Sequence, residues 1–185
     1  QTATLRLIPN MDVWRPCDTA ESLVARVEAA KAKDHPSSLI FSRQNLKFQA
    51  RNEQQLNDIK RGGYVISEAQ GNAQAVIIAT GSEVELALEA QKALAAQNIA
   101  VRVVSMPSTN VFDRQDAAYK AAVLPECLPR IAVEAGHADG WYKYVGLNGA
   151  VVGINRFGES APAELLFKEF GFTVENVVDT VKSVL

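Results

Sequence analysis

The sequence predicts an α/β protein: a three-layer α/β/α domain with a mostly parallel sheet, preceded by the truncated end of a second α/β domain. Three observations lead to this prediction. A complete strand–helix–strand unit spans Gln74–Ser105, further apolar runs alternate with helical patterns on both sides of it, and 48% of the 185 residues are apolar with a formal charge of −2. Such a chain can bury a sizeable core.

The central unit has two short apolar runs of the kind that form buried strands, Ala75–Ala79 and Val101–Ser105. Between them, a helical pattern follows the turn Thr80-Gly81, with Ser82 at the N-cap and Glu85 three residues later, which is a capping-box pattern. The helix is apolar on most of its surface, so it is expected to pack on a sheet. Consecutive strands joined by a helix predict a parallel pair with a right-handed crossover.

The residues before this unit predict a strand, a helix and a second strand. The strands are Thr4–Ile8 and Ser38–Phe41, and Asp18 is the expected N-cap of the helix between them, with Glu21 at its third position. A polar stretch with a short helical pattern follows and is broken by Gly62 and the next glycine. We therefore predict a boundary here, with residues 1–62 as the end of one domain and residues 63–185 as a complete second domain.

The second domain is expected to continue the alternation of strands and helices. The elements expected are strands at Tyr64–Ser67, Arg130–Glu134 and Gly149–Ile154, a helix at Arg114–Val123, a helical turn at Trp141–Val145, a helix from Pro162 to Phe170 and a last helix capped by Thr173.

Composition excludes several classes of protein. There is no excess of basic residues for nucleic acid or an anionic membrane surface, and no apolar run approaches the ~20 residues that span a bilayer. Cys17 and Cys127 have no metal-like spacing, and a reducing cytoplasm suits them best. The chain begins at Gln1 without an initiator methionine, so we expect it to be cut from a larger protein.

The turn Thr80-Gly81-Ser82 has the position of a phosphate-binding loop, because free backbone N–H groups point outward at the start of a helix. It lacks the Gly-x-Gly-x-x-Gly pattern and the Walker lysine, and Glu83 and Glu85 would repel a phosphate. A capped structural helix is the favoured interpretation.

A second candidate is the run Ser42-Arg43-Gln44-Asn45, which follows the carboxyl end of a predicted strand, where open α/β sheets bind ligands. The guanidinium group of Arg43 offers a planar fork of donors that fits a phosphate. From the residues alone, a salt bridge that stabilises the loop is the favoured role for Arg43, and phosphate binding is the alternative.

Other reactive residues predict no active site. His35 and His137 are expected in solvated loops, and Glu134, Glu159 and Ser160 are expected to have structural roles. Cys17 precedes a helix cap that could lower its pKa, but a buried, inert thiol is the default. The aromatic cluster Trp141–Tyr144 favours a core or subunit interface over ring stacking with a ligand.

Several motifs, in order along nearly the whole chain, closely resemble the transketolase family of the bacterial type. Those of the N-terminal part resemble the end of its pyrimidine-binding domain: Ile8-Pro9-Asn10-Met11, Trp14-Arg15-Pro16-Cys17-Asp18 and Ser42-Arg43-Gln44-Asn45-Leu46. Those of the remainder resemble its C-terminal domain: Ala79-Thr80-Gly81-Ser82-Glu83-Val84, Val104-Ser105-Met106-Pro107-Ser108, Trp141-Tyr142-Lys143-Tyr144-Val145-Gly146, Phe157-Gly158-Glu159-Ser160-Ala161-Pro162 and Glu169-Phe170-Gly171-Phe172-Thr173.

The resemblance implies a cytoplasmic, homodimeric parent enzyme of the pentose phosphate pathway. That enzyme moves a two-carbon ketol unit between sugar phosphates with thiamine diphosphate and a divalent metal, Mg²⁺ or Ca²⁺. In the family, the arginine of the Ser-Arg-Gln-Asn motif binds the substrate's phosphate, and this role carries over to Arg43. A charge clamp on the non-reacting end of the sugar would orient its carbonyl toward the cofactor.

Other family motifs are absent. Asp139-Gly140 lacks the preceding glycine and the continuation of the Gly-Asp-Gly cofactor motif. The family's catalytic glutamate and substrate-contacting histidines also have no counterpart here. We therefore assign no catalytic, cofactor or metal residue to this chain and expect it to be inactive alone. The alternative is a stand-alone interaction or regulatory module that binds a small anion or a partner subunit.

Overall fold

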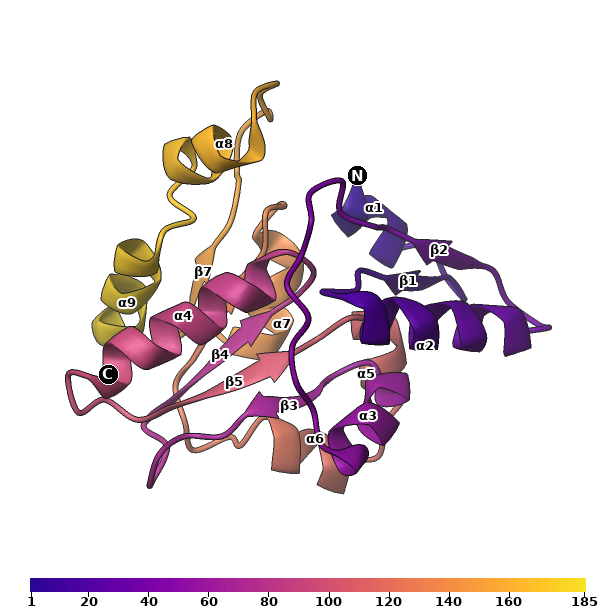
Figure 1. Ribbon diagram of the computed structural model, residues 1–185. Helices are drawn as coiled ribbons and strands as arrows, with labels where there is room; N and C mark the ends of the chain where they lie inside the picture. Colours follow the sequence, from indigo (N-terminus) through magenta and orange to yellow (C-terminus); the bar gives the residue numbers. More distant parts are fainter.

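The computed structural model describes all residues, 1–185, and contains two β-sheets (Figure 1). The strands are β1 (Asp12–Trp14), β2 (Ser37–Leu39), β3 (Tyr64–Ser67), β4 (Ala75–Ala79), β5 (Val101–Ser105), β6 (Arg130–Val133) and β7 (Ala150–Val152). The helices are α1 (Thr2–Arg6), α2 (Thr19–Lys31), α3 (Glu53–Asp58), η1 (Ile59–Arg61), α4 (Glu83–Ala95), α5 (Thr109–Asp113), α6 (Ala117–Val123), η2 (Asp139–Trp141), α7 (Tyr142–Val145), α8 (Ala163–Glu169) and α9 (Val174–Ser183). No helix among them combines the length and the apolar character needed to cross a membrane.

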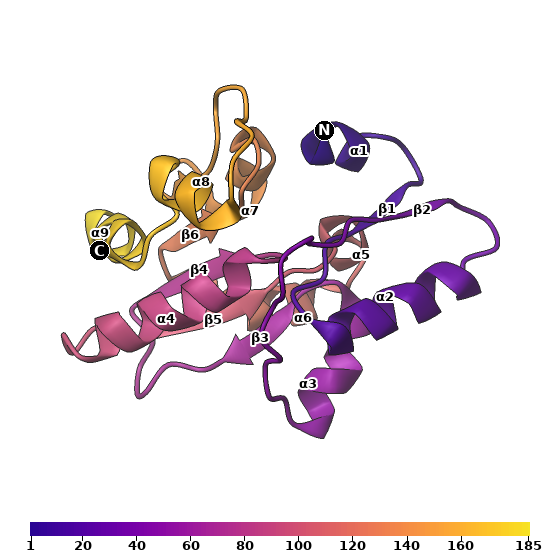
Figure 2. The same cartoon turned by 45° about the horizontal axis from the view of Figure 1, so that its top comes forward.

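The larger sheet has the strand order β3-β5-β4-β6-β7, and only β3 runs antiparallel to its neighbour. Helices α4 and α9 cover one face of this sheet, and α5, α6 and α7 cover the other (Figures 1 and 2). Side chains of β4 alternate between the two layers, since Ile77 joins the core under α4 and α9 while Ile78 joins the core on the opposite face. The predicted three-layer α/β/α architecture is confirmed.

The central strand–helix–strand unit, β4-α4-β5, is confirmed as a parallel pair, and Asn98 takes a left-handed backbone angle (φ 61°) just after α4. The predicted capping box is wrong. Ser82 occupies the N-cap position but accepts no backbone hydrogen bond, and its hydroxyl instead donates to Glu83 at 2.5 Å. Glu83 is fully buried. Its carboxylate accepts a hydrogen bond from a residue far along the chain, the backbone N–H of Ala135.

The N-terminal unit (residues 1–62) differs from the prediction at its start. Thr4–Ile8 is not a strand, since helix α1 occupies Thr2–Arg6 and buries none of its residues. The strand that pairs with β2 in parallel is β1, a few residues later. A run of five residues with three apolar side chains does not by itself distinguish a strand from a helical turn.

The N-caps predicted for two other helices are confirmed, whereas one predicted helix begins at a different residue. Asp18 caps α2 and Thr173 caps α9, each by accepting a backbone N–H through its side chain. The helix predicted over residues 114–123 begins three residues later, as α6, because Asp116 caps it, and a short helix that was not predicted, α5, precedes it with Ser108 as its cap.

Candidate phosphate-binding loop and its supports

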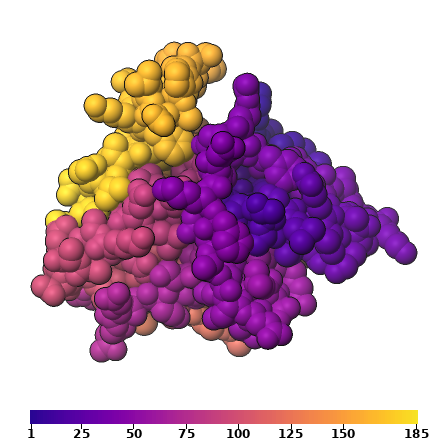
Figure 3. Space-filling model, in the orientation of Figure 1, coloured from indigo at the N-terminus to yellow at the C-terminus, as the bar shows by residue number.

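Arg43 lies on the loop that joins β2 to α3, just beyond the carboxyl end of β2, and its side chain is exposed. The guanidinium group makes no ion pair and no hydrogen bond within the chain. The salt-bridge role that the residues alone favoured is therefore wrong. Figure 3 shows the loop (purple) on the surface, between the indigo N-terminal segment and the pink atoms around α4. Arg43 is thus free to contact a ligand.

A hollow of about 480 Å³ lies beside this loop, between it and the start of α2. Ser42, Gln44 and Asn45 line it from the loop, and Thr19 and Arg26 line it from the helix. Hydroxyl and amide groups of these residues supply neutral hydrogen-bond donors beside Arg26, while Arg43 itself lies next to the lining residues in sequence and not in the lining. The hollow therefore has a mixed lining in which polar side chains outnumber apolar ones.

The loop is fixed at its two ends and free between them. At its start, the backbone N–H of Ile40 donates to the carbonyl of Trp14 at 2.8 Å. Toward its end, Lys47 pairs with Glu85 of α4, and the N–H of Gln49 donates to Asp18 at 3.0 Å. Within residues 42–48 the only backbone hydrogen bond is a local one, from the Gln49 side-chain amide to the Lys47 carbonyl at 3.1 Å, so the position of the loop depends on these anchors.

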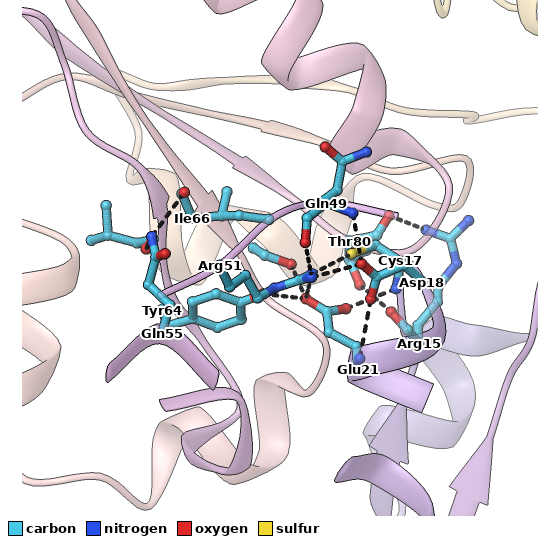
Figure 4. A network of polar contacts seen from close by, with 12 residues as sticks. Arg15, Cys17, Asp18, Glu21, Gln49, Arg51, Gln55, Tyr64, Ile66 and Thr80 are labelled. Atoms are coloured by element: carbon cyan, nitrogen blue, oxygen red, sulfur yellow. Dashed lines mark hydrogen bonds and ion pairs between the residues drawn. The ribbon is translucent and has the colours of Figure 1, made fainter. Parts of the chain in front are cut away.

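The anchor at the loop's end belongs to a buried polar network (Figure 4). Arg51, whose side chain is completely buried, donates to the Asp18 carboxylate and to the Gln49 carbonyl, both at 2.6 Å. It also donates to the hydroxyl of Tyr64 at 2.6 Å and to the sulfur of Cys17 at 3.2 Å. A single guanidinium group therefore joins the loop to α2 and to β3.

Glu21 is the buried acceptor at the other side of the network. Its carboxylate accepts hydrogen bonds from the Cys17 N–H (2.7 Å), the Tyr64 hydroxyl (2.8 Å) and the Ser105 hydroxyl (2.6 Å). These donors come from the start of α2, from β3 and from β5. The network thus connects the N-terminal unit to two strands of the larger sheet, and breaking it would release the loop's anchor.

Burial raises the pKa of the Cys17 thiol well above its usual value, and the nearby Glu21 and Asp18 carboxylates raise it further. The same causes in the same order, burial and then Glu21, raise the pKa of Tyr64. Cys17 is therefore the inert buried thiol expected by default, and the lowered pKa considered for it is wrong.

The sequence did not point to Arg51, Tyr64 or Ser105 as members of a network. Arg51 lies in a polar stretch without a motif, and the other two begin and end strands. Glu21 was expected only as part of a capping box, and its carboxylate indeed accepts a backbone N–H, but from Cys17 rather than from the capping residue. No local pattern could have found the network, because Tyr64 and Ser105 lie 43 and 84 positions from Glu21 along the chain.

The remaining candidates do not join this loop. His137 is exposed and lies 3.7 Å from Asp139, whereas Glu134 is buried and accepts hydrogen bonds from Arg6 and the indole of Trp141. Trp141 and Tyr144 are core residues, which confirms the structural interpretation of the aromatic cluster.

The residues of this chain do not fit thiamine diphosphate and its metal. No group of three or more histidine, cysteine, aspartate or glutamate side chains could hold a metal ion. The turn after β4, the one candidate for a diphosphate, is filled by Arg15: a Cβ atom on Gly81 would meet that side chain at 2.8 Å. We therefore derive no chemical step through the cofactor from these residues.

The fold and this loop define an α/β protein in which an exposed arginine lies on one unit and a three-layer domain supports that unit. A sequence model of the transketolase-like TK C-terminal domain matches residues 62–173. The chain belongs to the transketolase family.

Individual relatives agree with this assignment. The chain is 59% identical over its whole length to transketolase 1 of Escherichia coli strain K12 and spans 28% of that protein. The transketolase from Leishmania mexicana superposes with a TM-score of 0.91 at 42% identity, over 98% of this chain and 26% of that one. A transketolase of Pichia stipitis in complex with sedoheptulose-7-phosphate gives 0.89 at 39% identity, again over 98% and 26%.

Proposed function

We propose that this chain is the C-terminal part of an enzyme that transfers a two-carbon ketol unit between sugar phosphates of the pentose phosphate pathway. The observation that carries the proposal is the 59% identity with a bacterial transketolase over the entire chain. The complete enzyme would use thiamine diphosphate and a divalent metal held by residues that this chain does not contain. Alone, the chain would be inactive.

Within that enzyme, Arg43 would bind the phosphate of the sugar. Its guanidinium group is exposed and unpaired, and it lies on a loop beside a polar hollow. A relative with 39% identity has been solved in complex with a sugar phosphate. An arginine without an internal partner loses no existing ion pair when it binds a phosphate, so its charge contributes fully to substrate orientation.

Replacement of Arg43 by alanine in the complete enzyme tests this role. We expect kcat/KM for phosphorylated substrates to fall about 10- to 150-fold, because a charged hydrogen bond contributes roughly 1.5–3 kcal/mol. Unphosphorylated acceptors should be used almost as well as before. The measurement is steady-state kinetics with each class of substrate.

Lys33→Ala is the control, since it removes an exposed positive charge that lies outside the loop and belongs to none of its anchors. We expect it to leave the preference for phosphorylated substrates intact. Equal losses for both substrate classes in Arg43→Ala would reject the clamp.

Three further proposals concern the whole protein. Residues 1–62 would be the end of the pyrimidine-binding domain and residues 63–185 the C-terminal domain, in agreement with a family match that begins at residue 62. Two free cysteines favour a cytoplasmic location. The complete enzyme would be a homodimer, which sedimentation of the full-length protein would test.

A further inference from the structure

The larger sheet has a position where a ligand would be expected but where the protein has placed its own side chain. The chain leaves β4 for β5 on one side of it and later returns to β6 on the other side, so the strand order reverses at β4. In open α/β sheets, ligands bind at such a point, outside the carboxyl ends of the strands. Here that crevice lies between Thr80–Ser82, which follow β4, and Glu134–Gly136, which follow β6.

Arg15 fills this crevice. Its guanidinium group donates to the carbonyl of Thr80 at 2.7 Å (Figure 4), pairs with Glu83 and lies 3.8 Å from Glu134. The backbone of Arg15 is held as well, since its N–H donates to the Pro107 carbonyl at 2.7 Å and its carbonyl accepts the Gly81 N–H at 3.0 Å. Gly81 suits this turn, because its backbone is left-handed (φ 57°) and a Cβ atom there would lie 2.8 Å from the Arg15 guanidinium group and displace it.

A second arginine completes the balance of charge. Arg6 of α1 forms two hydrogen bonds to the Glu134 carboxylate, at 2.6 and 2.9 Å. The Glu83 side chain is completely buried and that of Glu134 is 3% exposed, so two buried carboxylates face two arginines. Burial alone would raise the pKa of Glu134, but Arg6 and then Arg15 outweigh it and hold that pKa below its usual value.

The acceptors are positioned without help from the arginines. Glu83 accepts the Ala135 N–H at 3.0 Å and the Ser82 hydroxyl, and Glu134 accepts the Trp141 indole N–H at 2.7 Å. All of these groups belong to the larger-sheet unit, whereas both arginines belong to the first fifteen residues. One unit therefore forms the crevice with its acceptor groups in place, and the other unit supplies the two arginines that bind there.

We propose that the crevice at the strand-order reversal is a guanidinium-binding site, filled in cis by Arg15 and Arg6, through which the C-terminal unit holds the unit that carries the Arg43 loop. With the Arg15 side chain removed, the site should bind a free alkylguanidinium ion. It should prefer a guanidinium to an ammonium group, because its acceptors (the Thr80 carbonyl and two carboxylates) surround a planar fork of donors. This proposal does not depend on the role of Arg43.

Chemical rescue of Arg15→Ala tests the site in the 185-residue chain. N-ethylguanidinium replaces the atoms that the substitution removes. We expect Arg15→Ala to unfold at a lower temperature than the unsubstituted chain, and millimolar N-ethylguanidinium to raise its Tm saturably by about 3 °C. The unsubstituted chain should show no rise, because its site is already filled.

Arg26→Ala is the matched control, since Arg26 is an exposed arginine outside the crevice. Ethylammonium is the control ligand. Arg6→Ala provides a second variant should Arg15→Ala not fold, because α1 buries no residue and Glu134 would still have Arg15 at 3.8 Å and the Trp141 indole N–H at 2.7 Å. A selective rise of Tm in the crevice variants supports the proposal. No rise in either, or an equal rise with ethylammonium or in Arg26→Ala, overturns it.

Discussion

At the scale of single residues, the structure assigns partners to side chains that were expected to be solvated. His35 has one ring nitrogen 2.8 Å from Asp34 and the other 2.9 Å from Asp12. Asp12 in turn accepts two hydrogen bonds from Arg114, both at 2.7 Å, which ties β1 to the residue that ends α5. His35 is thus part of a link between the two units and not a freely solvated loop residue.

This link predicts a dependence of stability on pH. The hydrogen bonds to Asp34 and then Asp12 raise the pKa of His35 above its usual value, so the folded state favours the charged ring. A raised pKa stabilises the fold fully below the unfolded value of about 6.5, and the contribution is lost as pH rises through the folded value. We expect the difference in unfolding free energy between the chain and His35→Gln to be larger at pH 6 than at pH 8, measured by urea denaturation.

His137 provides the control, because it is exposed and belongs to no link between the units. His137→Gln should keep the pH dependence of the unsubstituted chain. An unchanged pH dependence in His35→Gln would contradict the assignment.

At the scale of elements, the glycine after η1 shows how one turn sets the approach of two segments. Gly62 has a left-handed backbone (φ 82°), and a Cβ atom there would lie 2.4 Å from the Ser108 carbonyl and 2.6 Å from the Phe112 nitrogen. Both contacts are backbone atoms of α5 and its cap, which cannot move aside cheaply. The turn therefore fixes the distance between η1 and α5.

We expect Gly62→Ala to lower the unfolding free energy by about 3 kcal/mol or more, because left-handed strain of about 1–2 kcal/mol is added to a steric clash. Gly71→Ala isolates the strain, since Gly71 also has a positive φ (94°) but nothing within 4 Å of the added atom. Denaturant unfolding of both variants gives the comparison, and equal losses would show that the contact with α5 contributes nothing.

At the scale of the whole molecule, two buried polar networks join the N-terminal unit to the larger sheet. One centres on Arg51 and Glu21, and the other on Arg15 and Glu83. In each network, charged groups from both units are buried together. Removal of one charged side chain would therefore leave a buried charge without its counter-charge. The two units are therefore expected to form one rigid support for the Arg43 loop. The cofactor and its chemistry would be held by the parts of the complete enzyme that this chain does not contain.

Whether this chain binds the cofactor by itself can be measured directly. Isothermal titration of the 185-residue chain with thiamine diphosphate and Mg²⁺ should give no binding heat, because the chain offers no three-residue metal cluster and its one candidate turn is filled by Arg15. The complete enzyme is the positive control. Clear micromolar binding by the chain alone would refute its proposed inactivity and favour a self-sufficient module.

The sequence by itself determined those parts of the protein that depend on neighbouring residues. The β4-α4-β5 unit, the caps Asp18 and Thr173 and the break at Gly62 follow from periodicity, capping chemistry and glycine, all of which act over a few residues. The family resemblance likewise rests on contiguous motifs, and it made phosphate binding, which the residues alone offered as an alternative, the assigned role of Arg43.

Only the tertiary structure decided the role of each buried charge. Arg6 and Glu134 are 128 positions apart, and Arg15 and Glu83 are 68 apart, so no local pattern could show that they meet. Without its distant partner, Glu83 was taken for a group that merely repels phosphate at the start of a helix. With Arg15 in place, the same carboxylate binds a guanidinium group, because a buried charge is stable only where an opposite charge reaches it.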